Sequence, residues 1–174
     1  MNTEITYRLM RPDEAAAVCR LVENVFNEFV APTYVPEGIR EFMKYVTPEK
    51  LIKRSEENHS TVIAESYGRI VGMVEMRNGD HISLLFVEPR EQKRGIARGL
   101  MQRVIALHNC QHITVNSSPN AEPIYTRLGF TADGPEQTTH GIRFVPMTWT
   151  RRTKRDSVNQ ASQVMARKLA EPER

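Results

Sequence analysis

Hydrophobic residues along the first 150 positions follow two alternating periods. A two-residue period predicts strands, and a period of three to four residues predicts helices. The strand pattern occurs in six segments, at 4–10, 60–66, 69–77, 81–87, 112–118 and 141–150. The helical pattern occurs in four segments, at 14–29, 39–46, 96–105 and 121–129.

Two turn signals set the pairing of the central strands. Tyr67-Gly68 and Asn78-Gly79 separate consecutive strands and predict an antiparallel meander. A helix then separates the strand at 81–87 from the strand at 112–118, and such a crossover predicts parallel pairing. The order β-α-α-β-β-β-α-β-α-β therefore predicts an α/β (α+β) domain. Its sheet is expected to be mixed and mostly antiparallel, with helices on both faces.

The composition is that of an ordinary soluble domain. The chain has 174 residues, of which 40% are hydrophobic and 26% are charged, and this is enough to form one core. No apolar run reaches the 18 or so residues of a membrane span, and the N-terminus does not resemble a signal peptide. Cys19 and Cys110 form no spacing motif. We therefore expect a cytoplasmic protein without membrane contact.

The positive charge of the chain is concentrated at its C-terminus. Residues 151–174 contain seven basic and three acidic side chains and carry +4, so the other 150 residues carry −1 of the net +3. A basic face across the domain is not predicted, and nucleic acid is not an expected partner. We divide the chain into a domain at 1–150 and a basic tail at 151–174, which is either flexible or a short helix.

A strand passes into a helix within Phe86–Ile105 through a loop of glutamine, two bases and glycine. Free N–H groups at a helix start carry the positive end of the helix dipole, and Gly95 lets the backbone approach a ligand. Gln92, Lys93 and Arg94 add donors and positive charge. One interpretation is a diphosphate site, and the other is an ordinary turn with solvated charges. The glycine motifs of NTPases and dinucleotide-binding domains are absent.

Two motifs resemble the acetyl-CoA-binding segments of the GNAT superfamily of N-acetyltransferases. The first, [QR]-x-x-G-x-[GA], is matched by residues 92–97. The second is a strand that ends at Asn116, followed by a helix with Tyr125 three residues before Leu128-Gly129-Phe130. The predicted order of elements matches the family over about residues 4–150, so the resemblance implies a GNAT-type fold.

The resemblance also implies acetyl-CoA as the cofactor and a set of residues that contact it. The pyrophosphate would be held by backbone N–H groups of Gln92, Lys93, Arg94, Gly95, Ile96 and Ala97. The backbone of Phe86 and Val87 would pair with the pantetheine arm as an extra strand, where the two parallel strands separate. Asn116 would contact the arm from the opposite strand, and Tyr125 would lie near the thioester sulfur.

Acetyl transfer to an amine needs a base for the amine, a donor to the thioester oxygen and an acid for the leaving thiolate. The resemblance implies Tyr125 as the acid and the Val87 N–H as the donor, and the alternative for Tyr125 is packing on the sheet. His81 occupies the position of a glutamate base found in some family members, and an imidazole with a pKa near 6.5 suits a base at neutral pH. Glu75 on the facing strand is the second candidate. The alternatives are an exposed hairpin histidine and a solvent-facing glutamate.

The expected activity is transfer of an acetyl group to a primary amine, with a small-molecule amine favoured over a protein α-amine or lysine. Aromatic and acidic side chains between Phe26 and Tyr45 are either acceptor-site residues or packing and a solvated face. Two other classes stay open: an acyl-CoA-binding module without catalysis, and an interaction protein that acts through its tail. His108, Cys110 and His112 offer three metal ligands, but the family needs no metal and we expect none. The sequence leaves a homodimer open.

Overall fold

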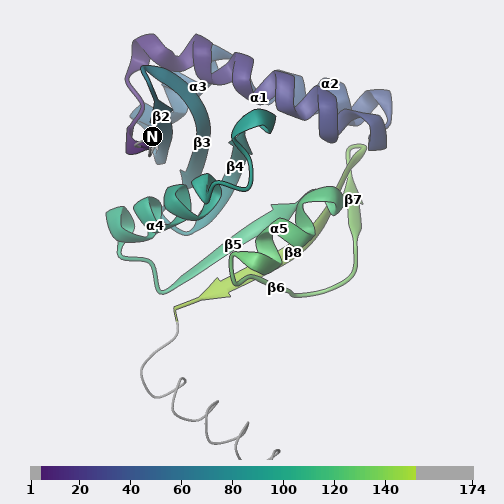
Figure 1. Ribbon diagram of the computed structural model, residues 1–174. Helices are drawn as coiled ribbons and strands as arrows, with labels where there is room; N and C mark the ends of the chain where they lie inside the picture. Colours follow the sequence, from purple (N-terminus) through teal and green to yellow (C-terminus); the bar gives the residue numbers. More distant parts are fainter. Residues whose placement is uncertain (1–4, 152–174) are drawn as a thin grey trace, which may run out of the picture.

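A twisted sheet of eight strands forms the centre of the molecule, with helices on both faces (Figure 1). The computed structural model describes residues 5–151, so the expected tail from residue 152 onward lies outside the described residues. The strands are β1 (Thr6–Leu9), β2 (His59–Ser66), β3 (Arg69–Arg77), β4 (His81–Val87), β5 (His112–Ser117), β6 (Thr131–Ala132), β7 (Gln137–Thr139) and β8 (Ile142–Thr150). The α-helices are α1 (Ala15–Phe29), α2 (Pro36–Tyr45), α3 (Pro48–Glu56), α4 (Ile96–His108) and α5 (Glu122–Arg127).

The order of strands in the sheet confirms the predicted fold class. It is β1-β2-β3-β4-β5-β8-β6, with β7 paired to β8 outside this path. The β4–β5 pair is parallel and the other pairs are antiparallel. Both predicted hairpin turns occur. Tyr67-Gly68 is a two-residue turn with φ of +49° and +72°, and such backbone matches the twist of a two-residue hairpin. Asn78 and Gly79, with φ of +53° and +77°, begin a three-residue turn that ends at Asp80.

The structure adds the helix α3 and the short strands β6 and β7 to the predicted order. Helix α3 begins at Pro48, and the Thr47 side chain caps it by accepting a hydrogen bond from the Lys50 backbone N–H (3.4 Å). Of its apolar side chains, Leu51 is fully buried and Ile52 only partly. One short apolar stripe gives no clear helical period in the sequence. Strands β6 and β7 are exposed along their whole length, so they have no hydrophobic alternation to detect.

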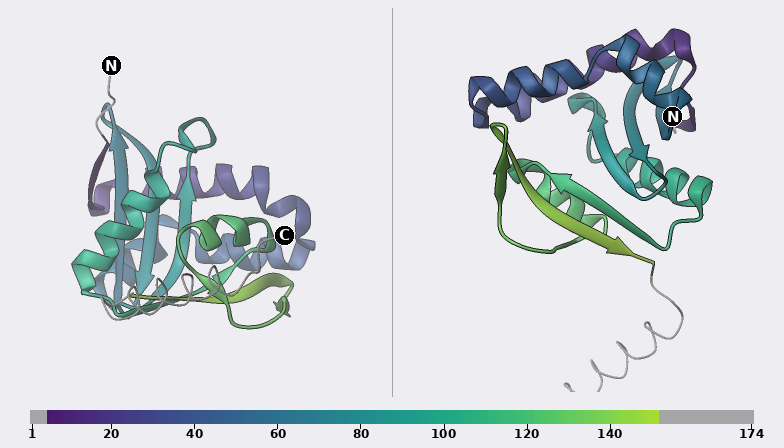
Figure 2. Two further views of the ribbon diagram at one scale, coloured as in Figure 1. Left: turned by 60° about the horizontal axis from the view of Figure 1, so that its bottom comes forward. Right: turned by 180° about the vertical axis from the view of Figure 1, so that it is seen from behind.

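Each face of the sheet has its own hydrophobic core, as the views in Figure 2 help to follow. Helices α4 and α5 cover one face, called here the α4 face, and α1, α2 and α3 cover the other, called the α1 face. The α4-face core includes Ile82, Leu85, Val87, Leu100, Val115 and Tyr125. The α1-face core includes Val22, Phe42, Tyr45, Leu51, Leu84 and Phe86. Side chains of β4 therefore reach both cores, as expected for a central strand.

The sheet opens between β4 and β5. These strands pair only at His81–Thr114 and Ile82–Val115. A β-bulge lies at the same point, because the register between β3 and β4 shifts and leaves Ser83 without a partner on β3. Beyond Ser83, β4 continues to pair with β3. Within the described residues, β4 and β5 form no further pair.

A contact between the α1–α2 region and the β7–β8 hairpin joins the two halves of the sheet again. Gly38 of α2 lies against Gly141, where an added Cβ would be 2.2 Å from the Gly141 carbonyl oxygen. The Tyr34 hydroxyl donates to the Arg143 carbonyl oxygen (2.9 Å), and Arg143 Nη1 donates to the Thr33 carbonyl oxygen (3.3 Å). The opening is therefore bounded by the β4–β5 pairs at one end and by this contact at the other.

Candidate active site

The open edge of β4 presents backbone groups that have no strand partner. The Glu88 N–H donates to the Val71 carbonyl oxygen (2.9 Å), so the backbone of Glu88 and of Phe86 faces β3. The alternation of an antiparallel ladder then directs the N–H and C=O groups of Leu85 and Val87 toward β5. An edge of this kind can pair with an extended ligand as if it were another strand.

The loop between β4 and α4 directs free N–H groups toward the same end of β4. Lys93 and Gly95 have positive φ, +63° and +80°, which turns the loop sharply before the helix. The Gly99 N–H is the first to bond within α4, to the Gly95 carbonyl oxygen (3.0 Å), so the three preceding N–H groups have no helical partner. A Cβ added to Gly95 would meet no atom within 4 Å. The loop therefore has both the donors and the space for an anion.

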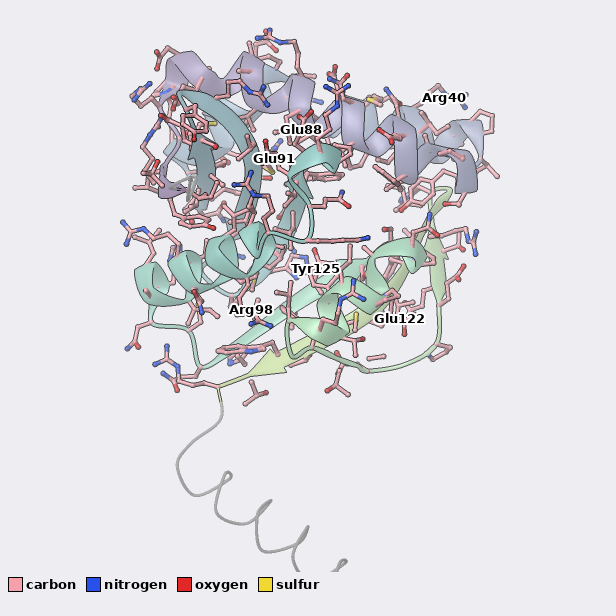
Figure 3. The ribbon with its side chains drawn as sticks, viewed as in Figure 1. Arg40, Glu88, Glu91, Arg98, Glu122 and Tyr125 are labelled. Carbon is pink, nitrogen blue, oxygen red and sulfur yellow. The ribbon has the colours of Figure 1, made fainter. Side chains whose placement is uncertain are left out.

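Positive charge beside these N–H groups comes chiefly from Lys93 and Arg98. Both side chains are exposed, and Arg98 lies in the first turn of α4 (Figure 3). Arg94, in contrast, forms an ion pair with Glu91 inside the loop. The Gln92 amide donates to the Val87 carbonyl oxygen (3.3 Å), which ties the loop to the end of β4.

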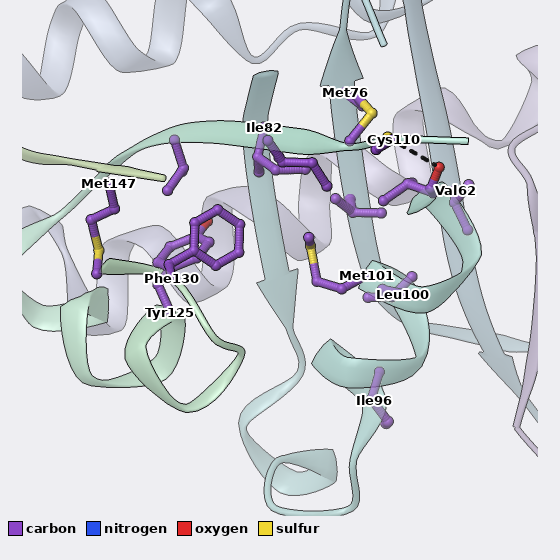
Figure 4. Packing of buried hydrophobic residues seen from close by; sticks show 14 of the residues in the cluster. Val62, Met76, Ile82, Ile96, Leu100, Met101, Cys110, Tyr125, Phe130 and Met147 are labelled. Carbon is purple, nitrogen blue, oxygen red and sulfur yellow. Dashed lines mark hydrogen bonds between the residues drawn. The ribbon is translucent and has the colours of Figure 1, made fainter. Parts of the chain in front are cut away.

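Tyr125 lies on α5 and directs its ring into the α4-face core (Figures 3 and 4). Its side chain is 6% exposed, and its ring packs edge-on against Phe130 with centroids 5.2 Å apart. Ile82, the last β4 residue paired with β5, belongs to the same core. Burial raises the pKa of Tyr125 well above its usual value, so the phenol is protonated at neutral pH.

Asn116 lies on the β5 side of the opening. It follows Val115, the last β5 residue paired with β4, and it stands opposite Pro146 of β8. Because successive side chains of a strand alternate and Val115 is in the α4-face core, Asn116 is on the α1 face, where it is exposed. The amide is therefore free to meet a ligand that enters the opening.

His81 lies two residues before the bulge, at the paired end of β4. Its Nδ1 is 2.8 Å from Thr114 Oγ1 on β5. The imidazole is half-buried, and burial lowers its pKa, with Arg77 lowering it further and Asp80 opposing. The alternative of a fully exposed hairpin histidine is therefore wrong as to its exposure. A neutral imidazole at neutral pH can accept a proton, and one water could span the short gap to the bulge.

Glu75 is enclosed beneath the helices of the α1 face, and the alternative of a solvent-facing glutamate is wrong. Its side chain is 0% exposed, and Arg54 of α3 donates to it through Nε (2.8 Å) and Nη2 (3.3 Å). The Tyr45 hydroxyl also donates to Glu75 (3.3 Å). A carboxylate with both oxygens bonded has no direct access to a substrate amine, which argues against the predicted role as a base.

Tyr45 and Arg54 complete this polar cluster. Tyr45 was among the aromatic side chains considered for the acceptor site, with packing as the alternative, whereas Arg54 was not predicted as a site residue. Arg54 lies on α3, which the sequence did not reveal. Tyr45 is the last residue of α2, three positions after Phe42, so both side chains lie on one helical stripe. This spacing was the one signal that could have placed Tyr45 beside the sheet.

Within 5–151, no three or more histidine, cysteine, aspartate or glutamate side chains gather closely enough to hold a metal ion. His108 and Cys110 have other partners, Ser60 Oγ (2.7 Å) and the Gly79 carbonyl oxygen (3.2 Å). In the same range, no helix is both long enough and apolar enough to cross a membrane.

Comparison with known proteins agrees with this architecture. Residues 30–151 match the family model described as acetyltransferase (GNAT) domain. The fold is similar to a GCN5-related N-acetyltransferase from Rhodopseudomonas palustris, with a TM-score of 0.74 and 22% identity over 87% of this chain and 99% of that chain. A search of curated proteins found no match.

Two other solved structures are similar at lower identity. The PaiA N-acetyltransferase from Thermoplasma acidophilum, in complex with coenzyme A, has a TM-score of 0.70 and 16% identity over 85% of this chain and 99% of that chain. A spermidine N-acetyltransferase chimera from Vibrio cholerae SpeG and hSSAT has a TM-score of 0.58 and 16% identity over 85% and 96%.

The fold is the one that these N-acetyltransferase structures share. The family model covers well over half of the chain. The protein therefore belongs to the GNAT acetyltransferase family.

Proposed function

We propose that the protein transfers an acetyl group from acetyl-CoA to a primary amine. The observation that carries this proposal is the opening between β4 and β5, which ends at the loop of free N–H groups before α4. Two sites of different chemistry thus lie in line, one for an extended chain and one for a diphosphate. Acetyl-CoA has both parts, and when bound it supplies the acetyl thioester.

The residues at the opening fit this cofactor. The N–H groups at 96–98 and the open space at Gly95 suit the pyrophosphate, and Gln92, Lys93, Arg94 and Ala97 complete the loop. Val87, together with Leu85, would pair with the pantetheine arm, and Phe86 would line it from the α1 face. Asn116 would reach the arm from β5.

Tyr125 and the β4 backbone would carry the two electrostatic tasks of the reaction. The Leu85 N–H, two residues deeper in the opening than the predicted Val87 N–H, would donate to the thioester oxygen as it gains charge, because the thioester would lie near the bulge. Tyr125, in the same core as Ile82 at the end of the opening, would give its proton to the departing sulfur as the thiolate forms. In the reaction, the amine nitrogen forms a bond to the acetyl carbon and the carbon–sulfur bond breaks. One N–H proton must also leave the nitrogen.

We assign the removal of that proton to His81. Its burial keeps the imidazole neutral near pH 7, and its Nδ1 is held by Thr114, so Nε2 is the nitrogen available to the substrate side. The distance from His81 to the bulge spans two residues, roughly 7 Å along the strand. A water molecule between the amine and His81 would therefore complete the path.

A small-molecule amine suits the acceptor side better than a folded protein. The contact of Gly38 with Gly141 bridges the opening on the side of α2, which leaves less room for a large acceptor. Glu28 and Glu37 are exposed on α1 and α2 and would attract a cation. Glu41 contributes less, because it pairs with Lys44 (2.7 Å).

Calorimetric titration with acetyl-CoA is the first test, followed by an amine panel read by release of the free thiol. The panel holds simple primary amines, spermidine, a lysine peptide and a peptide with a free N-terminus. One-site binding with turnover of a small amine supports the proposal. Binding without turnover of any amine would favour an acyl-CoA-binding module, and turnover of a peptide alone would move the substrate class to proteins. A folded protein that does not bind acetyl-CoA would contradict the proposal.

A further inference from the structure

The buried ion pair of Arg54 and Glu75 contacts Tyr45, the last residue of α2, at three points. Arg54 places its guanidinium carbon 3.7 Å from the centre of the Tyr45 ring, and its Nη1 donates to the Tyr45 carbonyl oxygen (2.9 Å). Glu75, bonded to the same guanidinium, accepts the Tyr45 hydroxyl proton (3.3 Å). A residue at the end of a helix is normally among the least ordered. Here the phenol has one enforced position.

That position is close to the place where β4 leaves β5, whose last pair is Ile82–Val115. Phe42, one turn earlier on α2, lies 6.1 Å from Phe86 near the open end of β4. Tyr45 is bonded to Glu75, and Glu75 pairs with Leu84, the residue that follows Ser83 at the bulge. Tyr45 therefore lies at the end of the opening at which the thioester of a bound cofactor would lie.

The chemistry of the three groups fixes the direction of the hydrogen bonds. An ionised carboxylate can only accept, and a guanidinium can only donate. Tyr45 must therefore use its single proton for Glu75. What its oxygen offers to any further partner is a lone pair, so Tyr45 can accept an N–H from an amine but cannot compete for the amine's own lone pair.

We propose that Tyr45 binds the acceptor amine through one of its N–H groups, and that Glu75 and Arg54 are positioning residues that act through Tyr45. The inference rests on the proposed acetyl transfer and specifies its substrate. An attacking nitrogen needs its lone pair for the acetyl carbon and one proton for the base. A second N–H, present in a primary amine and absent from a secondary one, would be the group that Tyr45 holds. The site thus selects primary amines.

The test compares Tyr45→Phe with the unmodified protein on an amine that the panel identifies and on its N-methyl derivative. The substitution keeps the ring, the contact with Arg54 and the bond to the backbone carbonyl, so the fold is retained. Loss of one hydrogen bond to a nitrogen donor is expected to raise KM for the primary amine about 10-fold. The ratio of kcat/KM for the primary amine to that for its N-methyl derivative should fall by a similar factor, and acetyl-CoA affinity should stay within about twofold.

A second readout does not depend on turnover. Protein labelled with 3-fluorotyrosine gives one ¹⁹F signal for each tyrosine, and the Tyr45→Phe variant assigns the signal of Tyr45. Amine added in the presence of coenzyme A should shift that signal and leave Tyr67, which is 78% exposed at the β2–β3 turn, unchanged. Tyr67→Phe is the matched control for the kinetics.

The outcomes separate the two proposals. Failure to bind acetyl-CoA would contradict the proposed function itself, before any result on Tyr45. With acetyl-CoA bound, an unchanged KM and an unchanged primary-to-secondary ratio in Tyr45→Phe would show that Tyr45 only anchors α2. Absence of any amine turnover, with no shift of the Tyr45 signal, would likewise overturn the inference.

Discussion

Tyr45 and Tyr125 approach the same point of the sheet from opposite faces. Tyr45, at the end of α2 on the α1 face, is bonded to Glu75, which pairs with Leu84 beside the bulge, and Tyr125 shares the α4-face core with Ile82 on the other side of the bulge. β4 leaves β5 between these two phenols. One phenol donates its proton to Glu75 and offers a lone pair, and the other is buried with its proton retained. The two phenols therefore differ in the way that the reaction would require, with a hydrogen-bond acceptor for the amine and a proton donor for the departing sulfur.

Gly95→Glu is expected to abolish acetyl-CoA binding. The new side chain would place a negative charge against the free N–H groups that the pyrophosphate needs, and affinity should fall at least about 100-fold, about 2.8 kcal/mol. Titration calorimetry measures it. Gly68→Glu is a matched control, since Gly68 also has positive φ (+72°) and open space around its Cα. Equal affinities in the two variants would remove the cofactor assignment.

Tyr125→Phe is expected to reduce turnover about 100-fold without weakening acetyl-CoA binding. The ring and its contact with Phe130 remain, while the proton for the departing sulfur is lost. Steady-state kinetics with acceptors whose rate is limited by the chemical step would measure the effect. Turnover equal to that of the unmodified protein would leave Tyr125 with a packing role alone.

The activity should decline on the acid side at a pH below 6.5. The pKa of His81 is lowered in the folded protein, so the imidazole is neutral and able to act as a base above that lowered value. As the pH falls through it, His81 gains a proton and kcat/KM drops. His81→Gln should lower kcat/KM and abolish this decrease of kcat/KM at acid pH. His59→Gln is the control, because burial lowers its pKa as well but it lies on β2; a decrease that disappears in that variant instead would contradict the assignment.

The same histidines make stability depend on pH. Both have lowered pKa values in the fold and an ordinary value near 6.5 when unfolded, so the unfolded chain binds more protons between these values. The contribution of these histidines to the free energy of unfolding should therefore be fully present above pH 6.5, and the free energy of unfolding should decrease as the pH falls below that value. Urea unfolding at several pH values measures this decrease, which should be smaller in His81→Gln. An identical slope in both proteins would count against a buried neutral His81.

Arg54→Met should destabilise the protein by about 3–5 kcal/mol, because it leaves the Glu75 carboxylate buried without its partner. Lys53→Met, at the exposed neighbouring position, should change stability little. The double variant Arg54→Met with Glu75→Gln should recover part of the loss, since no uncompensated charge remains. Denaturant unfolding measures these three variants and Glu75→Gln alone, and a loss in the double variant equal to the sum of the two single losses would show that the pair is not coupled.

Local signals in the sequence determined the order of elements and the loop motif. Alternation at 81–87, the Asn78-Gly79 turn and the glycine before α4 each depend on a few neighbouring residues, and the structure has them where they were predicted. The opening between β4 and β5 was expected only through the family resemblance, because a short segment does not reveal where two strands separate.

The tertiary structure alone decided which polar groups meet. Glu75 is 21 residues from Arg54 and 30 from Tyr45, and His81 is 33 from Thr114. Glu75 occupies an ordinary strand position in the sequence, and its burial follows from α3, a helix with too short an apolar stripe to predict. Contacts over such separations arise when helices pack on the sheet. The period of the hydrophobic residues indicates which side of a helix or strand is buried, but it does not indicate which other element covers that side.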